Sequence, residues 1–243
     1  MIFFIFLLGL AFGSFANVLI DRLPKGEDVM FGRSKCDYCR KTLAWYELIP
    51  LISFLLQGGR CRKCRKRLNW QYPLVELATA AGFACIYAFA FTSAGVLVFQ
   101  CLVFFALLVI FVTDGKYQII PDSMVAAGLI GVLIILGIRP DRILTALVTT
   151  FFFYCLYLVT RGRGLGFGDV KFSFLLGYLA GYPKIIVALY LAFLTGAAGG
   201  VILILAGKRK LKSRIAFGPF LVIGLAVSLV WGDRLISWFL KFL

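Results

Sequence analysis

The chain has 243 residues, of which 62% are hydrophobic and only 15% are charged. A soluble domain is about 45–50% apolar and about 25% charged, so this composition excludes a disordered chain, a coiled coil and a soluble nucleic-acid-binding domain. The net charge of +15 comes from short basic blocks between apolar runs, a pattern typical of membrane proteins. The sequence has no histidine, which excludes Ser-His-Asp and Cys-His nucleophiles and histidine-ligated metals.

The apolar runs predict an all-α membrane protein with about eight transmembrane helices. Each run is uniformly apolar, as expected for a helix surrounded by lipid. The first run has no basic region before it and no small-residue cleavage site after it, so we interpret it as a retained helix rather than a signal peptide. The predicted helices cover residues 2–20, 73–91, 96–113, 120–137, 143–160, 170–182, 185–206 and 216–240.

The loops between these helices predict the orientation of the chain. If the polar segment 21–72 is cytoplasmic, alternation of the helices places 114–119, 161–169 and 207–215 on the same side. That side, with Lys171, then carries 21 of the 26 basic residues, and the other side carries five. The positive-inside rule therefore predicts that both termini face outward.

The polar segment 21–72 contains two CxxC pairs, Cys36 with Cys39 and Cys61 with Cys64. Two such pairs, separated here by 21 residues, can place four thiolates tetrahedrally around one Zn²⁺, which predicts a structural zinc site. Disulfides are an alternative that a reducing cytoplasm disfavours, and a redox CxxC is another. The remaining cysteines lie in separate predicted helices and are interpreted as core residues: Cys85, Cys101 and Cys155.

Three aspartates, Asp114, Asp122 and Asp169, fall at the predicted cytoplasmic edge of the helices. Ionisable groups in or beside lipid are costly and are candidates for function. Two carboxylates at one depth on different helices can share a proton, which is what an aspartic protease needs to activate water. Gly166 and Gly168 would let the backbone, or an extended substrate, come close beside Asp169.

Each carboxylate also has a simpler interpretation. Asp122 follows a proline and is typical of a helix N-cap, and Asp169 can cap its own helix. Asp114 can pair with Lys116. Glu76, one turn into a predicted helix, can compensate the helix dipole or bind a ligand. These residues alone favour an aspartyl membrane enzyme and an ion-coupled transporter equally.

Several short strings occur in order along nearly the whole chain: GSFANV at 13–18, RLP at 22–24, the two CxxC pairs, ELIP at 47–50, YPLVE at 72–76, the segment 114–122, GFGDVK at 166–171 and AFGP at 216–219. Together these strings resemble the type IV prepilin peptidases. The resemblance implies a bifunctional enzyme of the bacterial cytoplasmic membrane, a GxGD-type aspartic protease. Such enzymes cleave the basic leader of pilins and pilin-like proteins after a glycine. They then N-methylate the new terminal residue with S-adenosylmethionine.

By matching position, the resemblance implies that Asp114 and Asp169 are the catalytic pair and that Asp122 lies outside it. The four CxxC cysteines match the zinc site of the family, which some members lack. We predict that five further residues support the substrate or the surrounding loops: Gly166, Gly168, Lys171, Glu47 and Glu76. The resemblance also implies prepilin precursors and the lipid bilayer as partners, and no nucleic acid.

The predicted organisation has three parts. Residues 1–20 form the first transmembrane helix, 21–72 a cytoplasmic tetracysteine domain that binds zinc, and 73–243 a seven-helix aspartic peptidase domain. The zinc domain and the catalytic pair are expected at the cytoplasmic face. A transporter is the alternative function, although it would need no tetracysteine domain and no internal repeat is apparent in the sequence.

Overall fold

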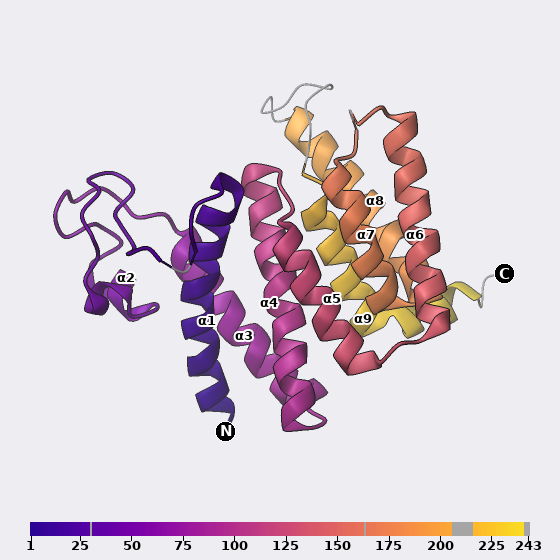
Figure 1. The fold of residues 1–243 in the computed structure, drawn as a ribbon, viewed down its shortest axis with the longest axis horizontal. Coiled ribbons are helices and arrows are strands. Elements are labelled where there is room, and N and C mark those ends of the chain that lie inside the picture. The colour runs from indigo at the N-terminus through magenta and orange to yellow at the C-terminus, as the bar shows by residue number, and fades with distance from the viewer. Residues whose placement is uncertain (30, 163, 206–215, 241–243) are drawn as a thin grey trace. The chain divides into compact units, whose positions relative to one another are not determined.

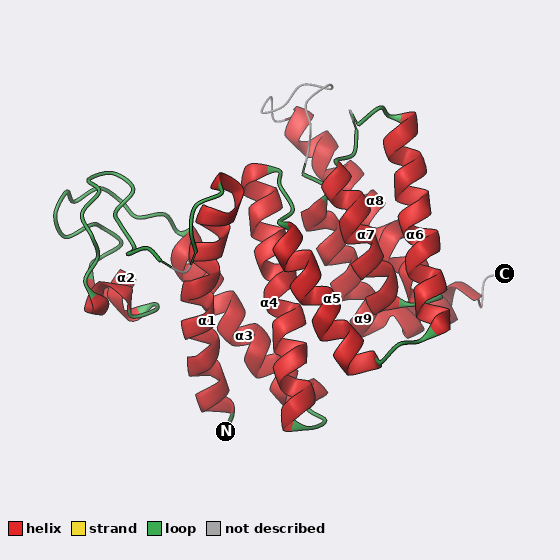
Figure 2. Ribbon diagram, in the orientation of Figure 1, coloured by secondary structure: helices red, strands yellow, loops and turns green. Residues whose placement is uncertain are grey.

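The structure is a computed structural model that describes residues 1–29, 31–162, 164–205 and 216–240 (Figure 1). Within these ranges the chain forms nine α-helices, two short 3-10 helices and no strand longer than an isolated bridge (Figure 2). The α-helices are α1 (Ile2–Arg22), α2 (Ile52–Leu56), α3 (Gln71–Ala90), α4 (Ala94–Tyr117), α5 (Asp122–Leu136), α6 (Pro140–Val159), α7 (Phe167–Ala180), α8 (Lys184–Leu205) and α9 (Gly218–Leu240). The 3-10 helices are η1 (Leu23–Lys25) and η2 (Trp45–Leu48).

The prediction of an all-α membrane protein is confirmed. Each of the eight predicted helices is present, with ends that differ from the prediction by a few residues. Six of them are long and apolar enough to cross a membrane, namely α1, α3, α4, α6, α8 and α9. With 15 and 14 residues, α5 and α7 are shorter than the length of about 20 that a spanning helix needs. The predicted basic turn 207–215 lies outside the described residues.

The chain folds into two compact units, Met1–Val109 and Ile110–Leu243, and the boundary falls within α4. In the first unit, α1 packs along α3. In the second unit, α6 packs on α7 and α8 packs on α9, while α5 also contacts α7. The second unit therefore holds the carboxyl-terminal end of α4 together with the amino-terminal ends of α7 and α9.

Two glycines on one face of α1 explain its close contact with α3. A Cβ atom at Gly9 would lie 2.5 Å from the Cα atom of Ala80, and one at Gly13 would lie 2.5 Å from the Cα atom of Glu76. Glycines four residues apart let the backbones of two membrane helices approach closely. The GxxxG spacing in α1 thus determines which face of this helix meets α3.

An aromatic cluster fixes the segment that leads into α9. The rings of Phe193 and Phe217 lie 5.0 Å apart, and Phe153 lies 6.3 Å from Phe193 and 6.4 Å from Phe217. These rings come from α6, α8 and the residue before α9, so the cluster joins three parts of the second unit. It positions the first residue of α9, Gly218, whose backbone N–H contacts the side chain of Asp114.

Candidate functional site

Asp114 lies near the carboxyl-terminal end of α4 and is only 5% exposed. Its Oδ2 atom accepts a hydrogen bond of 2.8 Å from the backbone N–H of Gly218, the first residue of α9. The first N–H groups of a helix have no partner within the helix and carry a partial positive charge. The amino-terminal end of α9 therefore stabilises and orients this carboxyl group.

Asp169 lies in the first turn of α7 and is 6% exposed. Its Oδ2 atom accepts a hydrogen bond of 3.0 Å from the backbone N–H of Gly166, so the side chain caps its own helix. The Oδ1 atom is buried and has no hydrogen-bond partner among the described residues. Since a buried polar atom without a partner is costly, such an atom points to a functional role.

The two carboxyl groups lie close enough to influence each other. Asp114 and Asp169 interact electrostatically, although they come from different helices of the second unit. Each has one oxygen held by a backbone N–H at a helix amino terminus. Two buried carboxyls that interact in this way cannot both carry a full charge at low cost, so such a pair can hold one proton between them.

The structure gives Gly168 a packing role, whereas Gly166 has room for an added Cβ atom. A Cβ atom at Gly168 would lie 3.2 Å from Cβ of Ile120, and one at Gly166 would lie 3.4 Å from Oδ2 of Asp169. Gly166 has an extended backbone, φ −78° and ψ 153°, which any residue can adopt. We predicted that backbone or an extended substrate comes close beside Asp169. At Gly168 the group that comes close is instead the side chain of Ile120.

Lys171 and Asp122 form an ion pair outside the buried site. The Nζ atom of Lys171 lies 2.7 Å from Oδ2 of Asp122, and both side chains are exposed. The interpretation of Asp122 as an N-cap is wrong, because Pro121 occupies the cap position and Asp122 is the first residue of α5. The carboxylate is still in the first turn, where the helix dipole favours it, and it joins α5 to α7.

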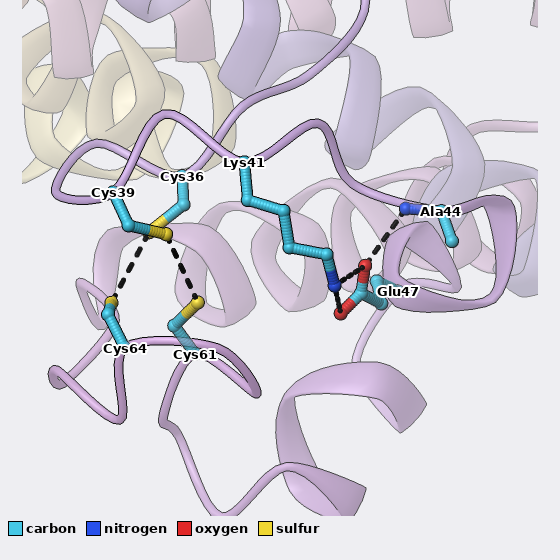
Figure 3. A network of polar contacts seen from close by, with 7 residues as sticks. All are labelled: Cys36, Cys39, Lys41, Ala44, Glu47, Cys61 and Cys64. Carbon is cyan, nitrogen blue, oxygen red and sulfur yellow. Dashed lines mark hydrogen bonds and ion pairs between the residues drawn. The ribbon is translucent and has the colours of Figure 1, made fainter.

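The four CxxC cysteines come together in the first unit (Figure 3). Their sulfur atoms all lie within 4.8 Å of one another, and the distances from Cys36 to Cys64 and from Cys39 to Cys61 are both 3.9 Å. Four thiolates with Zn–S bonds of about 2.3 Å in a tetrahedron would be about 3.8 Å apart. The cluster thus fits a tetrahedral metal ion, and all four cysteines are free thiols.

The two CxxC pairs sit in turns of the same construction. In the first, the N–H of Arg40 donates to the carbonyl of Cys36 over 3.0 Å, and in the second the N–H of Arg65 donates to Cys61 over 2.9 Å. Arg40 and Arg65 both have positive φ, 56° and 54°. Backbone N–H groups of Cys64 and Lys63 also lower the pKa of the Cys61 thiol, whereas burial raises the pKa of Cys36, so the first thiolate of the cluster forms at Cys61.

Glu47 lies beside the cysteine cluster, where Figure 3 shows its contacts. Its carboxylate accepts hydrogen bonds of 3.1 and 3.2 Å from Nζ of Lys41 and one of 2.9 Å from the N–H of Ala44. The N–H of Ala44, and after it the ammonium of Lys41, hold the pKa of Glu47 below its ordinary value. Partners within the loop therefore occupy this buried carboxylate, and its contact with a substrate stays a prediction.

Glu76 connects the loop to α3. It is buried in α3, and its Oε2 atom accepts a hydrogen bond of 2.8 Å from the N–H of Leu51. Leu51 has a positive φ of 57°, an uncommon conformation for a side chain of this size. Glu76 thus stabilises the strained turn that precedes α2. Neither helix-dipole compensation nor ligand binding, the two roles suggested by the sequence, includes this contact.

Gly218 is the residue of this site to which the sequence assigned no role. A Cβ atom there would lie 2.7 Å from Oδ2 of Asp114, so a larger residue would displace the carboxyl group. The signal in the sequence was Gly218-Pro219 at the start of an apolar run, because proline is common in the first turn of a helix. That pattern predicts N–H groups without a helical partner at residue 218, but it does not predict that the carboxyl group of Asp114 accepts their hydrogen bond.

Comparison with known proteins then identifies the family. Residues 7–90 match the Bacterial Peptidase A24 N-terminal domain, and residues 101–201 match the Type IV leader peptidase family. The chain belongs to the type IV leader peptidase family. The match over 7–90 contains the four cysteines, and the match over 101–201 contains both buried aspartates.

Named relatives extend this membership over nearly the whole chain. The chain is 32% identical to the prepilin leader peptidase/N-methyltransferase of Bacillus subtilis strain 168, over 99% of its length and 98% of the relative. It is 32% identical to the protein of the same name from Pseudomonas aeruginosa, over 97% of its length and 92% of the relative. No solved structure matches the chain. Membership of this peptidase family therefore favours the peptidase prediction over the alternative of an ion-coupled transporter.

Proposed function

We propose that this leader peptidase family member is a membrane-embedded aspartic endopeptidase. It removes the basic leader of type IV prepilins and pilin-like proteins after a glycine, and then N-methylates the new N-terminal residue. The names of relatives that align with nearly the whole chain support both activities. The observation that carries the proposal is the interacting pair of buried carboxyl groups, Asp114 and Asp169.

The pair would divide the work of peptide hydrolysis. One carboxylate takes a proton from a water molecule, whose oxygen then attacks the scissile carbonyl carbon. The protonated partner first polarises the carbonyl oxygen and then gives a proton to the departing amine as the C–N bond breaks. The buried Oδ1 atom of Asp169 is a position at which the water or the carbonyl group can bind.

Two backbone N–H groups keep this pair in position. The N–H groups of Gly218 and Gly166 bind one oxygen of Asp114 and of Asp169, respectively. Because each donor lies at the amino-terminal end of a helix, the carboxyls are oriented before the substrate arrives, and preorganised groups lower the barrier most effectively. The remaining oxygens are then left for the reaction.

The orientation of the chain suits such a substrate. We infer that the segment 21–72 and the aspartate pair are at the cytoplasmic face of a bacterial cytoplasmic membrane and that both termini are outside, because the basic residues divide 21 to 5. A prepilin has a basic leader in the cytoplasm and an apolar segment in the bilayer, so its scissile bond lies at the interface. Asp114 and Asp169 are close to helix ends, which is the depth this bond requires.

A labelling experiment tests this orientation. A cysteine at Asp141 should react with an impermeant thiol reagent added outside the cell, and a cysteine at Lys210 should not. Both positions are introduced into a chain whose only other cysteines are the four of the cluster. The reverse pattern would overturn the orientation.

The four clustered cysteines, Cys36, Cys39, Cys61 and Cys64, would hold one Zn²⁺, as the fit of their sulfur distances supports. Zinc with four thiolate ligands supplies a structural cross-link between the two turns and leaves no open position for catalysis. S-adenosylmethionine would donate the methyl group. On the family resemblance, we place methyl transfer with the amino-terminal part of the chain, which consists of the first helix at 1–20 and the segment 21–72. We place peptide cleavage with residues 73–243.

The proposed activities can be separated in one assay. The purified full-length protein is incubated with a synthetic prepilin peptide, with and without S-adenosylmethionine, and the products are identified by mass spectrometry. We expect cleavage after glycine in both cases, and a methylated mature fragment only when the methyl donor is present. A protein that leaves the peptide intact under both conditions, although folded, would overturn the proposal.

A further inference from the structure

The loop between α1 and α3 exposes a compact set of large apolar side chains, which we call the loop patch. Its members are Trp45, Ile52, Leu55, Leu56 and Trp70. Trp45 is 77% exposed, Leu55 74%, Leu56 76% and Trp70 68%. Soluble surfaces rarely present so many large apolar groups together, and such patches usually meet a protein or a membrane.

The loop patch is continuous because α2 brings its members together. Ile52, Leu55 and Leu56 are spaced i, i+3 and i+4, so they lie on one face of this short helix. The buried Phe54 of α2 packs on the ring of Trp70, with ring centroids 5.1 Å apart. Trp45 lies in η2, which contacts α2.

Trp70 sets the depth of the loop patch. It is the residue immediately before α3, a helix long and apolar enough to cross the membrane. A tryptophan at the end of a spanning helix belongs to the aromatic belt at the membrane–water interface. Since the ring of Phe54 packs on that of Trp70, α2 lies close to the start of α3 and thus near the same interface.

Charge around the loop patch complements an anionic lipid surface. Residues 33–67 contain ten lysines and arginines and only two acidic residues, Asp37 and Glu47. Both acidic groups have partners within the first unit, because Tyr72 donates to Asp37 over 3.0 Å and Lys41 binds Glu47. The loop thus presents cations beside apolar groups, the combination that binds anionic membranes.

We propose that η2, α2 and Trp70 form an in-plane anchor that rests in the headgroup region of the membrane. The side chains of Ile52, Leu55 and Leu56 enter the boundary with the acyl chains, and the basic residues of the two CxxC turns contact the phosphate groups of anionic lipids. The partner is the anionic phospholipid surface. This anchor is independent of the peptidase reaction, and it holds the cysteine cluster against the membrane.

Fluorescence quenching in a lipid bilayer tests the anchor. The chain has four tryptophans, so one variant keeps only Trp70 and another keeps only Trp45, with phenylalanine at the other three positions. Each full-length variant is reconstituted into nanodiscs of phosphatidylcholine and phosphatidylglycerol in a 3:1 ratio. We expect lipid with a nitroxide near the headgroup to lower the emission of both tryptophans at least twofold, and aqueous iodide to have little effect.

Two other quenching patterns would overturn the anchor. Quenching by iodide but not by lipid would place the loop patch in water. Emission that neither agent quenches would show that protein, either the rest of the chain or a second copy, covers the patch. Equal quenching by lipid in pure phosphatidylcholine would remove the anionic lipid as the partner.

A pair of matched variants tests the contribution of α2 itself. Replacing both leucines, Leu55→Asn with Leu56→Asn, should halve the quenching of Trp70 by lipid. Gln57→Asn, at the next position but outside the loop patch, should leave it unchanged. The metal content of each variant shows whether the loop is folded, and unchanged quenching in a folded double variant would exclude α2 from the anchor.

Discussion

The aspartate pair and the cysteine cluster each gather groups that carry negative charge, and each uses backbone N–H donors to do so. The donors to Asp114 and Asp169 are Gly218, the first residue of α9, and Gly166, the residue before α7. The donors to the Cys61 thiol are the backbone N–H groups of Lys63 and Cys64, which belong to the same four-residue turn. Asp114 and its donor Gly218 are 104 residues apart in the chain, whereas the bonded partners within each CxxC turn are four or five residues apart.

This difference in range teaches how each region should fail. The cysteine turns close on themselves, so a change in the helices of the second unit leaves their geometry intact. The aspartate pair exists only when three helix ends meet, so small displacements of a helix affect it. We therefore expect that each region can be disabled while the other remains functional, and the following predictions test that separation.

The largest effect should come from replacing either carboxyl of the pair with an amide. Asp114→Asn and Asp169→Asn each remove a group that must exchange a proton, so leader cleavage should fall at least ~10³-fold. Metal content and methylation of an already cleaved peptide should not change. Mass spectrometry of both reactions, with elemental analysis of the protein, measures all three quantities.

Asp122→Asn is the matched control for this experiment, because it makes the same change at a third aspartate of the second unit. Its carboxylate is exposed and paired with Lys171, so we expect it to retain substantial cleavage. The pH profile of the unmodified protein should be bell-shaped and belong to the pair rather than to one residue. Normal cleavage by either Asn variant of the pair would contradict the mechanism.

Removing one thiol should disable the other region alone. Cys39→Ser leaves three thiolates, and we expect the protein to lose its roughly one bound zinc per chain. Hydrogen exchange should then rise across residues 31–69, while the amides of α4 and α9 stay protected. Full metal content in this variant, or a disulfide in the reduced parent protein, would contradict the zinc site.

Gly218→Ala should have an intermediate effect, confined to cleavage. The new Cβ atom would lie 2.7 Å from Oδ2 of Asp114, so the carboxyl group must move. A displacement of about 1 Å can cost about 10²-fold in rate, and we expect kcat to fall about 10- to 100-fold with little change in KM. Steady-state kinetics with the prepilin peptide measures both constants.

Gly224→Ala provides the control on the same helix. Its Cβ atom would clash with the backbone oxygen of Ala188 and is not near Asp114. We expect this variant to lower the melting temperature more than Gly218→Ala does, but to lower kcat less. If the loss of kcat simply follows the loss of stability in both variants, then Gly218 has no positioning role.

The smallest effect should be local to the loop. Folding lowers the pKa of Glu47 through the N–H of Ala44 and the ammonium of Lys41. This carboxylate therefore stabilises the loop above its unfolded value of 4.5, and the contribution is lost as the pH falls through the lower folded value. Glu47→Gln should destabilise the loop by about 1 kcal/mol at neutral pH.

Urea titration of a variant that keeps only Trp45 measures this loop stability. At neutral pH the variant Glu47→Gln should unfold at lower urea than its parent, and the two midpoints should converge in acid. A constant difference between the midpoints at all pH values would show that the charge of Glu47 has no part in the effect.

The helices and the cysteine cluster could be predicted from the sequence because their signals are local. Uninterrupted apolar runs set the eight long helices, and the CxxC spacing identified all four cysteines of the cluster. The ends were less accurate. We predicted that the helix containing Val170 starts there, but it starts at Phe167, because Asp169 caps it through the N–H of Gly166.

Features that depend on distant partners were beyond the sequence. The N-cap interpretation of Asp122 was wrong by one residue, and its ion pair with Lys171 was not predicted because that partner is 49 residues away. Gly218 acts through its backbone N–H, and a backbone group carries no side-chain signal. The loop patch was missed because five exposed residues of α2 and its neighbours form one surface only after the loop has folded.

The hydrogen bond from Gly218 to Asp114 has a consequence for how the protein is made. Chains are synthesised from the amino terminus at about 5–20 residues per second, so α4 leaves the ribosome about 5–20 s before the first residue of α9. During that interval Asp114 lacks its donor and the aspartate pair is incomplete. On the proposed mechanism, the pair would therefore stay inactive while the helices are being inserted, and cleavage would begin only when α9 arrives.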